Sequence, residues 1–402
     1  MSRVGNPGPL EGVRVLDVAR QRAGPAAGLM MSRMGADVIK VEPPEGEYSR
    51  KSGPTARGQS VYWPQYNSGK RSLGVDLYSE KGKEILRRLV AVSDIFIQNF
   101  RPGTIEAMGF GYTVLKSLNP RIIMVNVSAY GQYGPYWERP GMDRVAAALS
   151  GFMYSHGAEG MPPIMVGESV LDQITALHAT IGALGALWER QRSGEGQSLD
   201  VALADSGYVA MAIPMSYYKA TGKVRPRPGL GSGLTGAFNC KDGMVFAMLG
   251  GANMLERISK TIGHPEWAEQ GRRSSQRDPA AASEEEKEFV AVAGKELERW
   301  FGQRTVAEVV SIISELGAII APINTVAQAA EDPHPWARDV MVEVSDPVAG
   351  KIHVPGDIMH YSRSGYNIGP GPTPGQHTQE ILTEILGMTD EDVRQLKEAN
   401  VI

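Results

Sequence analysis

The chain opens with a strand, a turn, a helix and a second strand, and this order constrains its fold more than any other feature. The apolar run 13–18 predicts a strand, and the turn at 19–25 leads into a helix that ends near residue 34. Residues 35–42 then predict the second strand. Strands joined through a helix lie parallel in one sheet. Later strands of the same buried type are predicted at 94–100, 121–128 and 197–203. The sequence therefore predicts an α/β fold with a parallel sheet.

The end of the first strand is a predicted ligand site, because parallel sheets bind ligands at the carboxyl ends of their strands. Arg20, Gln21, Arg22 and Ala23 occupy this position. The turn lacks the G-x-G-x-x-G pattern of dinucleotide-binding folds, which disfavours an ordinary nicotinamide dehydrogenase. Further along, Lys70 and Arg71 stand in a turn before another strand. They are candidates for holding phosphate, although paired basic residues in turns are commonly only solvated.

The overall composition narrows the classes of partner and site. A net charge of -4 gives no electrostatic reason to expect nucleic acid or an anionic membrane. The N-terminus lacks the apolar core of a signal peptide, and no long apolar run predicts a membrane span, so we expect a cytoplasmic protein. The single cysteine, Cys240, excludes disulfides within the chain and a cysteine-ligated metal site. We expect no metal.

The length and one change in composition predict two domains. A chain of 402 residues is long for one ordinary domain. The stretch 221–235 is rich in glycine, proline and arginine, which is typical of a linker. Helices predicted at about 254–262, 283–302 and 305–316 follow a hairpin-like pair of strands. A smaller domain of mixed helices and strands is therefore predicted after the linker.

The segment 167–190 predicts a long buried helix that ends at Gly194. Apolar positions recur at spacings of three and four, and alanines keep a second face small: Ile174, Leu177, Ile181, Leu184 and Leu187, then Ala176, Ala179, Ala183 and Ala186. Asp172 lies in the first turn or just before it. Free backbone N–H groups and the helix dipole favour an ionised carboxylate there, so Asp172 is a candidate nucleophile. The alternative is that Asp172 only caps the helix.

An ordered set of short motifs runs along nearly the whole chain, in addition to the stretch around Asp172. These motifs are Leu10–Asp17, Ala23–Pro25, Gly35–Glu42, Asn67–Ser72, Gln98–Gly103, Tyr130–Pro135, Gly141–Asp143, Asp332–Arg338 and Gly375–Leu382. Together they resemble the class III CoA transferase family of the CaiB/BaiF type, which includes formyl-CoA and carnitine CoA transferases. The resemblance implies a Rossmann-like large domain, 1–220 and 326–402, whose sheet is built from both chain ends. It also implies a smaller inserted α+β domain, 221–325, and an interlocked homodimer.

The same resemblance implies an activity that suits Asp172. Its carboxylate attacks an acyl-CoA thioester to form a mixed anhydride, and the CoA thiolate returns to form an aspartyl-CoA thioester, from which an incoming carboxylic acid takes the CoA. Acyl-CoA and a small carboxylic acid are then the substrates, and coenzyme A is the co-substrate.

The resemblance also places the remaining site residues. It implies that Arg20, Gln21, Arg22 and Ala23 surround the pantetheine and thioester. Near the nucleotide and the rest of CoA it implies Asn99, Phe100, Arg101, Lys70, Arg71, Tyr130 and Asp143. Gly250 and Gly251 match a glycine-rich lid over the active aspartate. Formyl-CoA transferase has Gln where Arg22 stands, so we hypothesise that this guanidinium recognises an acyl group with a second carboxylate.

Three other functions stay open from the sequence. The first is a 2-methylacyl-CoA racemase of the same fold, although racemases carry His where Met142 stands. The second is a CoA-ester binding protein without catalysis. The third is the nicotinamide dehydrogenase disfavoured above.

Overall fold

The computed structural model describes residues 6–227, 229–250, 252–268 and 283–402, which form two compact units. The larger unit comprises residues 1–154, 165–224 and 333–402. The smaller one comprises residues 155–164 and 225–332. The small unit thus takes a short segment from the middle of the large one, which the linker at 221–235 does not reveal.

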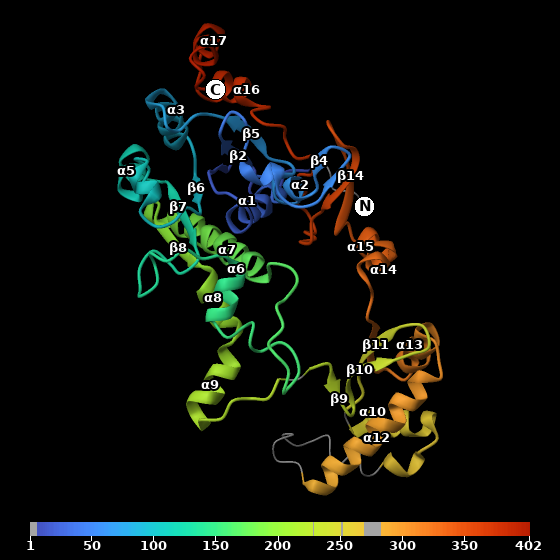
Figure 1. The fold of residues 1–402 in the computed structure, drawn as a ribbon. Helices are drawn as coiled ribbons and strands as arrows, with labels where there is room; N and C mark the ends of the chain where they lie inside the picture. The colour runs from blue at the N-terminus through green and yellow to red at the C-terminus, as the bar shows by residue number, and fades with distance from the viewer. Residues whose placement is uncertain (1–5, 228, 251, 269–282) are drawn as a thin grey trace. The chain divides into compact units, whose positions relative to one another are not determined.

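A six-stranded sheet with the order β5-β2-β1-β6-β7-β8 forms the centre of the larger unit (Figure 1). Its strands are β1 (Arg14–Asp17), β2 (Asp37–Glu42), β5 (Arg71–Gly74), β6 (Ile95–Gln98), β7 (Ile123–Ser128) and β8 (Ser198–Ala202). All neighbouring strands are parallel. The predicted parallel α/β sheet is confirmed.

Helices cover both faces of this sheet, because successive residues of a strand point to opposite sides. Val15 of β1 lies in the apolar core that contains α1 and α7, whereas Leu16 lies in the core that contains α3 and α5. The helices of the larger unit's first two segments are α1 (Ala23–Arg33), α2 (Tyr62–Asn67), α3 (Glu80–Ala91), α4 (Thr104–Ala107), α5 (Tyr112–Leu118), α6 (Asp143–Leu149), α7 (Val170–Ser193), α8 (Leu203–Ala210) and α9 (Ala212–Thr221). A 3-10 helix, η1 (Tyr48–Lys51), and a small β3–β4 pair (Thr55–Ala56, Gln59–Ser60) follow β2.

The C-terminal segment returns to the larger unit without adding a strand to the parallel sheet. Its elements are α15 (Pro333–Ala337), the antiparallel pair β13 (Met341–Asp346) and β14 (Gly350–Pro355), α16 (Thr378–Glu380), the π-helix η4 (Ile381–Ile385) and α17 (Asp390–Glu398). It borders the edge strand β5 through isolated hydrogen bonds, such as His377 N–H to the Ser72 carbonyl at 3.0 Å. The prediction that both chain ends build the sheet is therefore wrong, because the C-terminal end contributes helices and apolar side chains to one face instead.

The smaller unit is an α+β structure with its own core. An antiparallel sheet of order β12-β11-β10-β9 carries helices on its surface. Its elements are β9 (Gly231–Ser232), β10 (Thr235–Asn239), β11 (Met244–Met248), α10 (Ala252–Ile262), η2 (Pro265–Trp267), α12 (Glu284–Gly302), α13 (Val306–Glu315), β12 (Ile319–Pro322) and α14 (Val326–Glu331). Phe238 and Phe301 stack at 4.6 Å in this core.

Helix α7 buries its alanine face together with Leu171 and Leu187, whereas other large apolar side chains of the helix are exposed. Ala176, Ala179 and Ala183 are fully buried in the core that contains α1. The side chains of Leu177 and Ile181 are 44% and 63% exposed. The prediction of a buried helix is therefore wrong for this part of the helix surface. The alanine face packs against α1 because small side chains allow two helices to approach closely. By length and composition α7 is long and apolar enough to cross a membrane, but core helices of globular proteins pass the same criterion.

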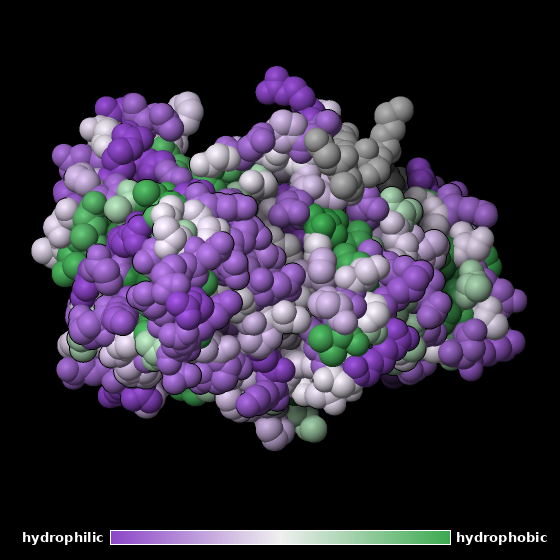
Figure 2. All heavy atoms as spheres, turned by 90° about the horizontal axis from the view of Figure 1, so that it is seen from above, coloured by the Kyte–Doolittle hydropathy of each residue, from purple (hydrophilic) through white to green (hydrophobic). Residues whose placement is uncertain are grey.

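Other exposed apolar side chains are Trp188 on the same helix and Ile213 and Tyr218 on α9. Figure 2 shows hydrophobic residues (green) interrupting a mainly hydrophilic surface on one face of the molecule.

Candidate active site

A cavity of about 710 Å³ lies at the carboxyl ends of β1, β6 and β7 in the larger unit. Seven of the predicted site residues line it: Arg20, Gln21, Arg22, Ala23, Asn99, Phe100 and Asp143. Asp172 lines the same cavity from the first turn of α7. The structure therefore brings together Arg20 and Asp172, which lie 152 positions apart in the chain, at the edge of the sheet where parallel folds bind ligands.

Asp172 is the third residue of α7, and it is not the capping residue of that helix. The helix begins at Val170, and Ser169 occupies the N-cap position. The backbone N–H of Asp172 donates a 2.9 Å hydrogen bond to the carboxylate of Asp143, which lies at the first position of α6. Asp143 thus satisfies a free N–H at the start of α7 and leaves the side chain of Asp172 facing the cavity.

The carboxyl group of Asp172 has an unusually high pKa. Burial has the largest effect and raises the pKa, and the nearby charge of Asp143 raises it further. Arg22 and a hydrogen bond with Ser169 lower the pKa, which is about 7 as a result. The prediction that the helix terminus keeps Asp172 fully ionised is therefore wrong near neutral pH, because desolvation and a second carboxylate outweigh the dipole. A group with such a pKa in a cavity is a common mark of a functional site.

Arg22 brings a guanidinium to the same part of the cavity. Its Nε donates a 3.1 Å hydrogen bond to the hydroxyl of Tyr62, and the guanidinium lies 5.0 Å from the centre of that ring. Nη1 is 3.4 Å from a carboxylate oxygen of Glu168, whose side chain is 88% exposed. Among the described residues, none accepts a hydrogen bond from Nη2 of Arg22. One edge of the guanidinium is therefore available to an anion.

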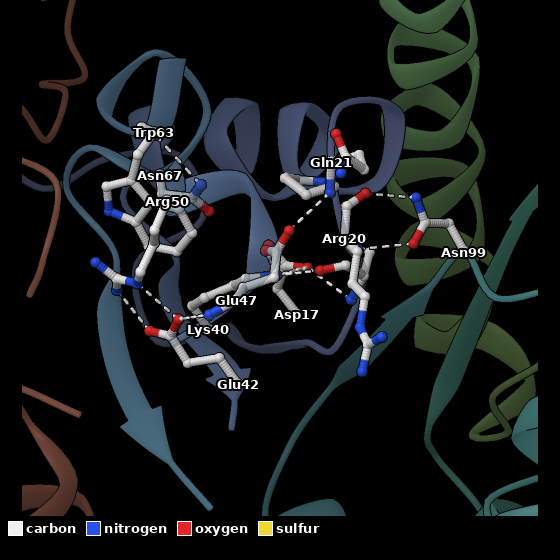
Figure 3. Close-up of polar contacts among 12 residues, drawn as sticks. Asp17, Arg20, Gln21, Lys40, Glu42, Glu47, Arg50, Trp63, Asn67 and Asn99 are labelled. Atoms are coloured by element: carbon white, nitrogen blue, oxygen red, sulfur yellow. Dashed lines mark hydrogen bonds and ion pairs between the residues drawn. The ribbon is translucent and has the colours of Figure 1, made fainter. Parts of the chain in front are cut away.

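The turn that carries these residues is tied to its neighbours (Figure 3). The side-chain amide of Asn99 accepts a hydrogen bond from the N–H of Arg20 and donates one to its carbonyl, both at 2.7 Å. The guanidinium of Arg20 lies 5.0 Å from the centre of the Phe100 ring. Asn99 and Phe100 thus hold the first turn as well as line the cavity.

A second cavity of about 340 Å³ adjoins the first and shares residues with it. Arg101 and Tyr130 line this second space together with Trp137 and Arg139. Arg139 itself lies over the ring of Tyr136 at 4.2 Å. Two arginines and several aromatic rings suit a ligand that carries phosphate and a planar base.

Two predicted phosphate-binding residues lie elsewhere. Lys70 is buried and donates hydrogen bonds to Asp17, Asn67 and the carbonyl of Pro25, the shortest being 2.6 Å. Arg71 starts β5 at the opposite end of the sheet from the cavity. The prediction that Lys70 and Arg71 hold the nucleotide is wrong, because both cations are engaged by the protein's own oxygen atoms.

Arg71 is held there by two carboxylates. It pairs with Asp37 at 2.5 Å and with Glu380 at 2.9 Å.

Gly250 lies in the smaller unit and Gly251 lies outside the described residues, so the lid stays a prediction. No group of three metal-ligating side chains occurs in the part of the chain that the structure describes.

Tyr62 and Ser169 also line the cavity, although no sequence motif singles them out. The same holds for two buried charges that contact the turn after β1, Lys40 and Glu47. A lysine between the apolar residues Ile39 and Val41 of a strand is the signal that points to Lys40, since an unpaired ammonium is rarely buried.

Comparisons with known proteins agree with this geometry. The model of CoA-transferase family III matches residues 10–378. The chain is 34% identical to succinyl-CoA–D-citramalate CoA-transferase of Chloroflexus aurantiacus, covering 100% of both chains. It is 31% identical to human succinyl-CoA:glutarate CoA-transferase, over 100% of this chain and 91% of the relative. Formyl-CoA:oxalate CoA-transferase of Streptomyces coelicolor is also 31% identical, over 98% of this chain and 99% of the relative.

Solved structures show the same fold. A CaiB/BaiF family protein from Brucella suis superposes with a TM-score of 0.82 at 30% identity, covering 94% of this chain and all of that one. Rv3272 from Mycobacterium tuberculosis superposes with a TM-score of 0.79 at 29% identity, covering 93% of this chain and 99% of the other. The chain belongs to CoA-transferase family III and is a class III CoA-transferase, an enzyme that transfers CoA between acyl-CoA esters and carboxylic acids.

Proposed function

We propose that this enzyme exchanges CoA between dicarboxylic acids, with succinyl-CoA as a donor, and that Arg22 binds the second carboxylate. The observation that carries the proposal is the guanidinium of Arg22 in the cavity of Asp172, with an edge that no described residue occupies. A planar guanidinium is suited to bidentate binding of a carboxylate. Several relatives are named as enzymes that act on succinyl-CoA with citramalate, malate or glutarate, which supports the same substrate class.

The proposed chemistry uses Asp172 as the nucleophile. Its oxygen attacks the acyl carbon, the C–S bond breaks, and CoA thiolate leaves behind a mixed anhydride. The thiolate then attacks the acyl carbon of Asp172 and releases the donor acid, which leaves an aspartyl-CoA thioester. The acceptor carboxylate attacks this thioester and releases thiolate, which attacks the acceptor's acyl carbon and regenerates Asp172.

The environment of Asp172 favours these steps. Burial and the charge of Asp143 both disfavour the ionised carboxylate. In the mixed anhydride and in the thioester, Asp172 carries no charge. Acylation therefore relieves the repulsion and the desolvation that the free carboxylate experiences, so the same surroundings that raise the pKa stabilise the covalent intermediates relative to the resting ion.

The substrate proposal is tested by an Arg22→Gln variant with succinyl-CoA as donor and glutarate or butyrate as acceptor. We expect kcat/KM for glutarate to fall about 100-fold, since a charge-assisted hydrogen-bonded pair is lost, while butyrate transfer changes little. The matched control is Glu168→Gln, which keeps the guanidinium and is expected to keep the preference for glutarate. Equal losses with both acceptors in the Arg22→Gln variant would contradict the proposal.

We also propose that two copies of this chain associate through the exposed apolar side chains of α7. Ile181 and Trp188 are exposed by 63% and 74%, which is costly for a helix in water unless a partner covers it. An Ile181→Glu variant is expected to shift the wild-type dimer toward monomer in light scattering. The control is Glu189→Gln on the same helix, and a variant that stays dimeric like the wild type would exclude this face as the contact.

A further inference from the structure

In the turn Ala19–Gln21, each backbone N–H and C=O from the N–H of Ala19 to the N–H of Gln21 is hydrogen-bonded to a side chain (Figure 3). Asn99 binds both groups of Arg20, as described above. The N–H of Ala19 donates to Asp17 at 3.1 Å, and the carbonyl of Ala19 accepts from the ammonium of Lys40. The N–H of Gln21 donates to Glu47 at 3.0 Å. This turn therefore owes its shape to side chains from separate strands and loops.

The backbone of Gln21 has a left-handed conformation, with φ of 65°. A residue with a Cβ adopts this conformation at a cost of about 1 kcal/mol or more. Glu47 accepts the hydrogen bond of this same residue. Gln21 and its two neighbours line the cavity of Asp172, so a relaxation of the Gln21 backbone would move three cavity residues together.

Lys40 and Glu47, which form hydrogen bonds with the backbone of Ala19 and Gln21, also form a buried ion pair with each other. The ammonium of Lys40 is 3.1 Å from Glu47, and the side chains are 0% and 2% exposed. Burial opposes both charges, but Lys40 lowers the pKa of Glu47, and neighbouring carboxylates of Asp17 and Glu47 raise the pKa of Lys40. Both groups are therefore ionised at neutral pH.

Such a pair is a poor source of stability. Moving two ions out of water offsets most of their attraction, and apolar side chains of similar volume often stabilise a fold equally well. A second buried pair lies beside the first: Lys70 is 2.6 Å from Asp17, and Asp17 is 3.8 Å from Lys40. The two ammonium groups and the two carboxylates of these pairs therefore have no net charge. Removal of Lys40 and Glu47 together leaves the remaining two balanced.

We propose that Lys40 and Glu47 are positioning residues of the CoA-transfer reaction, which fix the Ala19–Gln21 backbone so that Arg20, Gln21 and Arg22 face Asp172. The pair touches no substrate and acts only through the turn. The proposal rests on the proposed role of this turn in substrate binding, but not on which acid the enzyme uses.

The test is a Lys40→Met/Glu47→Leu double variant, which replaces the pair by apolar side chains of similar size and keeps the charges balanced. The Ala19 carbonyl and the Gln21 N–H lose their partners in this variant, so we expect the Tm to fall by about 5 °C, whereas kcat falls about 100-fold, as misplaced substrate groups require. Transfer is measured from succinyl-CoA to glutarate, or from formyl-CoA to oxalate if the first pair is not used. A folded double variant with kcat within about twofold of the wild type would overturn the proposal.

A second measurement separates positioning from a general effect on folding. Glycine adopts the left-handed conformation without penalty, so the activity lost on removing the pair is expected to be several-fold smaller when Gln21→Gly is already present. Equal losses in the two backgrounds would contradict the proposal, and this cycle stays informative if the double variant is less stable.

The control is Arg190→Met, which breaks the partly buried 2.8 Å pair with Asp94 at the far end of α7. It is expected to lower the Tm and to leave the KM values and kcat per folded enzyme unchanged. A comparable loss of kcat in this variant would show that any broken buried pair impairs the reaction, and it too would overturn the proposal.

Discussion

The backbone amide of Asp172 donates a 2.9 Å hydrogen bond to the carboxylate of Asp143, so the first turn of α7 holds the two acidic side chains of the active site together. Asp143 has two effects through this contact. It fixes the start of the helix that carries Asp172, and its charge contributes to the raised pKa of Asp172. The geometry and the ionisation of Asp172, the proposed nucleophile, are therefore coupled.

The first prediction concerns the pH dependence of the wild-type enzyme. The proposed attack on the thioester requires the ionised carboxylate of Asp172, and the pKa of this group is about 7. We therefore expect kcat/KM to rise with pH and to level off above a midpoint of about 7. Initial rates of CoA transfer between about pH 5.5 and 8.5 measure this, because kcat/KM reports groups of the free enzyme. A profile that is flat across this range would contradict the assignment of Asp172.

An Asp143→Asn variant separates the two effects of Asp143. The amide oxygen still accepts the hydrogen bond from Asp172, but the negative charge is gone. We expect the midpoint of the pH profile to move to lower pH, because the repulsion that raises the pKa of Asp172 is removed. Asp143→Ala serves as the comparison, since it loses the hydrogen bond as well and should also lower the Tm. An unchanged midpoint in Asp143→Asn would mean that burial alone sets the pKa.

An Asp172→Asn variant is expected to be inactive and more stable at pH 8. The pKa of Asp172 is about 7 in the folded chain against 3.8 in the reference state. The unfolded chain therefore ionises at lower pH than the folded chain, so stability falls as pH rises from about 4 to 7 and stays low above. Asparagine removes this penalty, and we expect a Tm roughly 2–5 °C higher at pH 8. The gain should vanish near pH 4, where both states of the wild type are protonated; a gain that persists there would point to another cause.

Two arginine variants test the revised assignment of the CoA site. Arg101→Gln removes a cation that lines the second cavity, and we expect the KM for acyl-CoA to rise about tenfold. Arg71→Gln breaks the pair with Asp37 at the other end of the sheet, so it should lower the Tm and leave that KM unchanged. Steady-state kinetics and thermal unfolding distinguish the two. A raised KM in Arg71→Gln alone would restore the original prediction.

The sequence predicts the parallel sheet and the location of the site because both depend on local patterns. Apolar runs and turns define the strands, and the carboxyl ends of parallel strands converge, which brings Arg20 and Asn99 together. The local sequence pattern does not show which residue forms an ion pair with a given charged side chain. Lys70 and Arg71 look alike in sequence as cations in a turn, yet one meets Asp17 in the interior and the other meets Asp37 at a sheet edge.

The ionisation of Asp172 is a further property that local pattern does not determine. Its position in the first turn of a helix favours the charged form, and that much is readable from the sequence. Asp143 lies 29 positions earlier in the chain, and only the folded chain shows that it faces the same turn. Similarly, α7 has two faces suited to burial, and the choice of the alanine face depends on the close approach of α1.

The C-terminal segment, which supplies no strand to the sheet, has a consequence for how the protein is made. Ile381, Leu382 and Val393 belong to the same apolar core as Leu16 and Phe96. While the ribosome is still adding residues 333–402, one face of the central sheet is covered by α3 and α5 but lacks the apolar side chains of the C-terminal segment. The insertion at 225–332 is already complete by then and has a separate core. The smaller unit can thus fold before the larger one is complete, and part of the apolar face of the central sheet stays exposed until the C-terminal segment has been made.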